Sequence, residues 1–141
     1  MAMFYRKDIL DSIGLEVPDT MNDVIQMLPA LQQNGMNFFY PTAGMAGMKI
    51  FAGTMPMVYQ NGGQFYDQYL GNTLLNEEKA IKGMRKLTDL FTIYNMPYDV
   101  PSFYQSFRDG SLPIGISDYG AYNLILNAAP EIQNLWEISL M

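Results

Sequence analysis

Residues 117–122 combine three side chains that can bind a polar ligand. They read Ser117-Asp118-Tyr119-Gly120-Ala121-Tyr122 and follow an apolar segment typical of a buried strand. In open α/β sheets, ligands bind beyond the carboxyl ends of the strands, where helices begin. A carboxylate accepts hydrogen bonds from fixed hydroxyl groups, and a tyrosine ring offers an apolar face to the C–H surface of a sugar. Asp118, Tyr119 and Tyr122 are therefore candidate ligand-binding residues, and the chemistry that suits them is saccharide binding.

The same segment also has a purely structural interpretation. Asp118 can serve only as a helix N-cap, with both tyrosines packed against the core, and local features favour the two interpretations about equally. Tyr40 ends a short aromatic segment and can point into the same cleft, although such segments more often belong to a core. Asn61 is a further candidate, although residues 60–63 are explained more simply as a turn after a helix.

Residues for common kinds of catalysis are missing or scattered. The chain has no His and no Cys, which removes imidazole bases, thiol nucleophiles, disulfides and the usual zinc sites. Ser117 loosely resembles a nucleophile elbow but has no His to act as its base. A glycosidase needs two carboxylates facing one cleft. The acidic candidates are spread along the chain, and each has a cap, turn or surface role: Asp67, Asp99, Asp109, Asp118 and Glu131. We therefore expect no enzyme activity, no metal and no cofactor.

Composition excludes several classes of partner. The 141 residues are 49% hydrophobic and 16% charged, as in a globular domain with a real core. A net charge of −6 repels phosphate backbones, so nucleic acid is not an expected partner. No apolar run reaches the roughly 20 residues of a membrane span. Residues 1–7 carry charges after a very short apolar run, so they are not a signal peptide, and the signal of an exported protein would precede them.

Strand and helix signals alternate along the chain and predict an α/β fold. Helix signals are clearest after Thr20, which forms a capping-box-like pair with Asp23. Gly35 is placed to end this helix, and Pro29 is expected to bend or divide it. Short apolar or aromatic runs predict strands at residues 2–5, 37–40, 112–116 and 136–140, and small strands at 65–67 and 69–71.

A second amphipathic helix is predicted over residues 76–94. Asn76 is its expected N-cap, and its apolar residues recur at helical spacing: Ile81, Met84, Leu87, Phe91 and Tyr94. We expect this face to pack on the sheet that contains Ile114 and Ile116.

Several segments, in the same order along almost the whole chain, resemble the family 1 extracellular solute-binding proteins of ABC importers. This carbohydrate-binding group includes the maltose-binding proteins. The segments are residues 4–10 (FYRKDIL), 18–23 (PDTMND), 61–63 (NGG), 107–116 (FRDGSLPIGI), 129–132 (APEI) and 136–138 (WEI). The departures are Met21, where the family often has Trp; Tyr119 and Tyr122, where some members have Trp; and Asp67, which does not match the family's acidic residue securely.

The resemblance implies one α/β lobe of a two-lobed periplasmic-binding-protein clamshell of type II, spanning residues 1–141. Its hinge strands would lie near residues 2–5 and 136–141. It also implies a lipoprotein outside the cell or in the periplasm, anchored through a segment before Met1, that captures a saccharide and delivers it to an ABC permease. A lobe for a peptide or polyol, or a protein-interaction module, is the alternative. The exposed cleft and hinge strands would favour self-association of the 141-residue chain.

Overall fold

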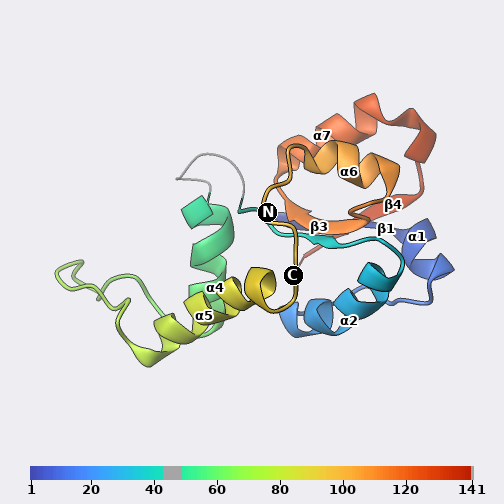
Figure 1. The fold of residues 1–141 in the computed structure, drawn as a ribbon. Coiled ribbons are helices and arrows are strands. Elements are labelled where there is room, and N and C mark those ends of the chain that lie inside the picture. The colour runs from blue at the N-terminus through green and yellow to red at the C-terminus, as the bar shows by residue number, and fades with distance from the viewer. Residues whose placement is uncertain (43–48, 141) are drawn as a thin grey trace. The chain divides into compact units, whose positions relative to one another are not determined.

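The computed structural model describes residues 1–42 and 49–140, which fold into two compact units. One unit comprises Met1–Tyr40 with Asp99–Met141, and the other comprises Pro41–Tyr98. Figure 1 shows the strands in the first unit and the helices α4 and α5 in the second. This division does not test the predicted single lobe or its hinge strands, which stay predictions.

The first unit is built on a mixed four-stranded sheet of order β2-β3-β1-β4. The strands are β1 (Ala2–Arg6), β2 (Phe38–Phe39), β3 (Ile114–Ser117) and β4 (Trp136–Ser139). β2 runs parallel to β3, whereas β1 is antiparallel to both β3 and β4. Each strand lies within or close to a segment predicted from the sequence, and the predicted α/β class is confirmed.

Strands β1 and β4, which carry the two predicted hinge segments, are neighbours. Tyr5 lies opposite Glu137, and its hydroxyl donates a hydrogen bond of 2.7 Å to that carboxylate. Burial, together with this bond to Glu137, raises the pKa of Tyr5 to about 12. The two strands are thus joined by side chains as well as by the backbone ladder.

Helices cover both faces of the sheet (Figure 1). The helices α6 (Phe103–Asp109) and α7 (Tyr119–Ala128) lie on one face, and α2 (Met21–Gln33) lies on the other. Short α1 (Lys7–Ser12) follows β1, and a 3₁₀ turn at Pro130–Ile132 leads toward β4. The core on the α6–α7 side is formed by Phe4, Phe39, Val100, Phe103, Phe107, Leu112, Ile125, Ala129 and Ile132. This core supports the segment predicted to bind ligand.

The helix α2 confirms the capping prediction. The Thr20 side chain accepts from the Asp23 backbone N–H, and the Asp23 carboxylate accepts from the Thr20 backbone N–H in return. Gly35 follows the helix with a φ of +73°, a conformation that glycine adopts without strain. Pro29 does not divide the helix, which runs on to Gln33.

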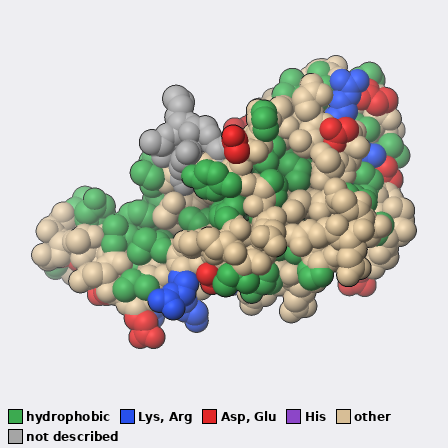
Figure 2. All heavy atoms as spheres, in the orientation of Figure 1, with side chains coloured by type: hydrophobic (Ala, Val, Ile, Leu, Met, Phe, Trp, Pro, Cys, Tyr) green, Lys and Arg blue, Asp and Glu red, His purple; other side chains and the backbone are tan. Residues whose placement is uncertain are grey.

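The second unit is a helix pair with a loop. A π-helix (η1, Lys49–Thr54) leads into α4 (Met55–Gln60), and α5 (Glu78–Thr92) packs against both. Between α4 and α5, the predicted small strands are reduced to one antiparallel bridge from Tyr66 to Thr73. Large apolar side chains reach the surface in this loop, where Tyr69 is 83% exposed. Figure 2 shows hydrophobic atoms reaching the surface in several places on the face in view.

The prediction for residues 76–94 was wrong in two respects. The N-cap is Glu77 rather than Asn76, and the helix packs on α4 and η1 rather than on the sheet. Its fully buried positions are Ala80, Gly83 and Leu90, whereas Ile81 is 42% exposed. The physical reason is backbone approach: a Cβ at Gly83 would lie 2.6 Å from the Met57 carbonyl oxygen. Small residues, rather than the large apolar ones, therefore face α4.

We expect Gly83→Ala to lower the free energy of unfolding by about 1–3 kcal/mol, because the added methyl overlaps the α4 backbone and outweighs the helix preference of Ala. Urea unfolding measures the loss. Gly71→Ala is the matched control, since a Cβ there meets no atom within 4 Å. Equal stability of the two variants would contradict the close α4–α5 contact.

Candidate functional site

The junction of β3 and α7 places the three main candidate residues together. Asp118 is the N-cap of α7, with extended backbone angles, and its Oδ1 accepts from the Ala121 backbone N–H at 3.2 Å. The capping role considered from the sequence is therefore confirmed. Asp118 is exposed, and its second carboxylate oxygen has no hydrogen-bond partner within the described part of the chain. The cap leaves that oxygen available as an acceptor.

Tyr119 and Tyr122 stack on each other at the first turn of α7. Their ring centroids are 5.4 Å apart and their planes differ by 12°. Tyr119 is 70% exposed, so it does not pack into the core as the structural interpretation required. Because Tyr122 covers one face of the Tyr119 ring, the opposite face is the one open to a ligand.

An aromatic chain connects this pair to the core. The half-buried Tyr122 packs edge-on against Trp136, with ring centroids 5.5 Å apart. Trp136 in turn stacks on Phe4, with ring centroids 6.1 Å apart. Trp136 also contacts Phe107 edge-on at 6.3 Å. Trp136 thus packs between the tyrosine pair and the core. The core below it holds Tyr122 in place, and Tyr122 in turn supports the exposed ring of Tyr119.

The two weaker candidates occupy different surroundings. Tyr40 follows β2, whose parallel pairing with β3 matches Phe39 to Gly115, so Tyr40 and Asp118 follow strands that end at the same sheet edge. The Tyr40 side chain is only 2% exposed, and this burial raises its pKa. Asn61, in the second unit, ends α4 and donates from Nδ2 to the Met57 carbonyl at 2.7 Å. Ligand contact by Tyr40 or Asn61 stays a prediction.

Three of the scattered carboxylates, those of Asp67, Asp109 and Glu131, take structural roles. Asp67 accepts from the backbone N–H groups of Tyr69 and Gly71 and from the Asn72 side chain, and the Asn72 bond is the main reason that its pKa is lowered. Asp109 accepts from the Ser111 N–H, and Glu131 pairs with Arg108. Within residues 1–42 and 49–140, no group of three His, Cys, Asp or Glu side chains could hold a metal ion. Over the same ranges, no helix has the length and apolarity needed to span a membrane.

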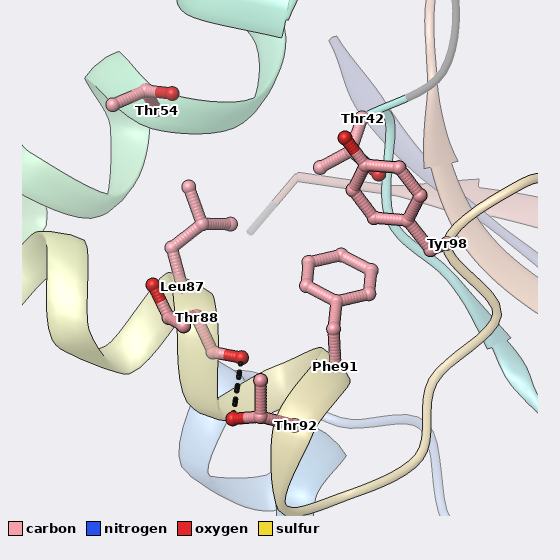
Figure 3. Close-up of a pocket in the computed structure, with 7 residues that line it drawn as sticks. All are labelled: Thr42, Thr54, Leu87, Thr88, Phe91, Thr92 and Tyr98. Atoms are coloured by element: carbon pink, nitrogen blue, oxygen red, sulfur yellow. Dashed lines mark hydrogen bonds between the residues drawn. The ribbon is translucent and has the colours of Figure 1, made fainter.

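The second unit contains a cavity that sequence reasoning missed. Its volume is about 410 Å³, and it is lined by Thr42, Thr54, Leu87, Thr88, Phe91, Thr92 and Tyr98 (Figure 3). From the sequence, Leu87 and Phe91 were predicted to lie on a core-packing face. Here they form an apolar wall of the cavity instead. The signal that could have indicated it is the pair Thr88 and Thr92, one turn apart beside that face.

Comparison of the sequence with protein-family models and with curated proteins gives no match. Solved structures do match. An ABC transporter solute-binding protein from Thermotoga lettingae, bound to α-D-tagatose, gives a TM-score of 0.82 at 18% identity and aligns with 98% of this chain and 38% of its own. The maltose-bound MalE3 of T. maritima gives a TM-score of 0.81 at 20% identity, over 98% of this chain and 37% of its own.

An ABC substrate-binding protein from Listeria monocytogenes, in complex with cycloalternan, gives a TM-score of 0.77 at 19% identity over 99% of this chain and 36% of its own. The chain therefore has the fold of one part of these solute-binding proteins and spans just over a third of their length. The fold expected from the sequence resemblance is confirmed. The T. lettingae and L. monocytogenes neighbours are described as binding proteins.

Proposed function

We propose that this chain is part of a solute-binding protein of an ABC importer, and that the amino end of α7 contributes a saccharide contact. The observation that carries the proposal is Tyr119, whose 70% exposed ring is stacked on Tyr122 and follows Asp118, a carboxylate of which one oxygen caps the helix. One apolar ring face next to a charged acceptor suits a pyranose, which has C–H faces and hydroxyl donors. The fold supports the proposal, because the similar structures are sugar-bound.

The charge of the junction favours a neutral ligand. Asp118 is the only charged side chain in residues 117–122. The carboxylate of a peptide or of a sugar acid would be repelled there, whereas a neutral saccharide would not. In this proposal the whole protein acts outside the cell or in the periplasm, is anchored to the membrane as a lipoprotein, and delivers the sugar to a permease without catalysing a reaction.

The test uses the longer protein that contains this chain. A thermal-shift panel that starts with maltose and tagatose identifies a sugar, since a ligand bound only by the native state raises the melting temperature. Calorimetry with that sugar is then repeated on three variants. We expect Tyr119→Ala to weaken binding about tenfold, because one stacking face is lost, and Tyr119→Phe to bind normally.

Asp118→Ser separates the two roles of Asp118. Serine is as good an N-cap as aspartate, so the melting temperature should hold, but the charged acceptor is gone. We expect a loss of about 1.5–3 kcal/mol in binding free energy. Tyr69→Ala is the matched control, since Tyr69 is 83% exposed and lies in the other unit. Unchanged affinity in both Tyr119→Ala and Asp118→Ser would remove α7 from the binding site.

A further inference from the structure

The cavity of the second unit is walled mainly by one face of α5 (Figure 3). Leu87, Thr88, Phe91 and Thr92 come from α5, and Tyr98 follows it in the chain. Phe91 and Tyr98 meet edge-to-face, with centroids 5.6 Å apart and planes at 87°. These rings and the Leu87 side chain provide apolar surface that a flat ligand can contact on more than one side.

The threonine hydroxyls of α5 are set to accept hydrogen bonds. Thr88 donates its hydroxyl proton to the Met84 carbonyl at 3.0 Å, and Thr92 donates to the Thr88 carbonyl at 3.1 Å. A hydroxyl that has given its proton to a backbone carbonyl still has acceptor lone pairs. This part of the wall can therefore receive a proton donor from a ligand but has little to donate to one.

None of the described residues that line this cavity is charged. An ionic ligand that entered it would lose part of its hydration without gaining a counter-charge, which is unfavourable. The volume of about 410 Å³ falls within the range of small-molecule sites, roughly 300–1,000 Å³. The size of the cavity, its uncharged described lining and the acceptor oxygens of Thr88 and Thr92 together suit a small, neutral ring that carries a hydroxyl donor.

We propose that this cavity is a second small-molecule site, which binds a neutral hydroxylated ring of the phenol class. The ring lies against Leu87, Phe91 and Tyr98, and its hydroxyl donates to the Thr88 hydroxyl oxygen. All of the described residues that line the cavity belong to the second unit, whereas Asp118 and Tyr119 belong to the first.

The test is ligand-observed fluorine NMR with 4-fluorophenol and the 141-residue chain. We expect its resonance to broaden as protein is added, with saturable binding. 4-Fluoroanisole has the same ring but no donor, and we expect it to bind about five times more weakly. 4-Fluorobenzoate carries a charge and should not broaden. No broadening of 4-fluorophenol, or equal binding of 4-fluoroanisole, would overturn the proposal.

Variants locate the site. Leu87→Trp fills the cavity and should weaken 4-fluorophenol binding about tenfold or more, and Thr88→Val keeps the shape but removes an acceptor, so a loss of about fivefold is expected. Circular dichroism melts check that both variants fold. If Leu87→Trp does not fold, Thr88→Val locates the site, because it is a near-isosteric change at an exposed residue. Tyr119→Ala should bind 4-fluorophenol normally. Binding that survives Thr88→Val unchanged, or that is lost in Tyr119→Ala, would contradict the assignment.

Discussion

Replacing Phe107 by alanine is expected to lower the free energy of unfolding by about 3–5 kcal/mol. Phe107 is fully buried. Its ring centroid lies 5.4 Å from that of Phe103, 6.4 Å from that of Phe4 and 6.3 Å from that of Trp136. Truncation removes the apolar contacts with these three side chains and leaves a cavity that closes only as far as the sheet and α6 can relax. Urea unfolding with linear extrapolation gives the free energy.

Phe51→Ala is the matched control for this prediction. The Phe51 side chain is 69% exposed, so the same chemical change should alter stability by no more than about 0.5 kcal/mol. If Phe107→Ala and Phe51→Ala unfold at the same urea concentration, then Phe107 is not part of the core that supports α7. The proposal that this core holds Tyr119 and Tyr122 in position for a saccharide would then lose its support.

Replacing Arg6 by methionine is expected to destabilise the chain by about 2–4 kcal/mol. Arg6 is only 7% exposed, and its Nε and Nη2 donate to the two Asp8 carboxylate oxygens at 2.8 and 2.7 Å. Its Nη1 donates to the Phe107 and Arg108 carbonyls at the end of α6, at 3.3 and 3.2 Å. Methionine keeps most of the volume but leaves the carboxylate and both carbonyls without these donors.

Lys7→Met removes a neighbouring positive charge and serves as the control. The Lys7 side chain is 58% exposed and its ammonium group lies 3.7 Å from the Glu137 carboxylate, a surface pair that contributes less than about 1 kcal/mol. Similar losses of unfolding free energy in Arg6→Met and Lys7→Met would show that the change in net charge, rather than the loss of the Arg6 hydrogen bonds, explains the effect.

The Arg6–Asp8 pair also has a pH signature. The hydrogen bond from Arg6 is the main reason that the pKa of Asp8 lies below its ordinary value. The folded state therefore binds this proton less readily than the unfolded state does, and the stabilisation is complete above the ordinary carboxyl pKa. This stabilisation is lost as the pH falls through the lowered pKa that Asp8 has in the folded state. Between about pH 6 and pH 2 the stability gap between wild type and Arg6→Met should narrow; a constant gap would contradict this assignment.

Local signals in the sequence predicted the strands and the capped helix α2 because these features depend on neighbouring residues. Thr20 and Asp23 are close in the chain, and Gly35 ends the helix that they begin. The packing of α5 could not be predicted in the same way. Hydrophobic periodicity selected Ile81 and its partners, whereas the contact with α4 depends on the absence of a side chain at Gly83. A close backbone approach leaves no apolar signal.

The candidate site was predicted in composition but not in geometry. Asp118 at a strand-to-helix junction indicated both a cap and an acceptor, and a single carboxylate has oxygens for both. The direction of the Tyr119 ring depends on Trp136, which packs below Tyr122 from a distant strand. The cavity beside α5 was missed because Thr88 and Thr92 bond within their own helix and resemble ordinary surface residues in the sequence.

We propose that α7 contacts a saccharide through Tyr119 and Asp118. The most direct measurement is a crystal structure of the longer protein with the sugar identified by the thermal-shift panel. We expect a pyranose face in van der Waals contact with the open side of Tyr119, and a sugar hydroxyl within about 2.5–3.0 Å of the Asp118 oxygen that does not cap the helix. A bound sugar that touches neither residue, with Asp118 serving only as the N-cap of α7, would contradict the account.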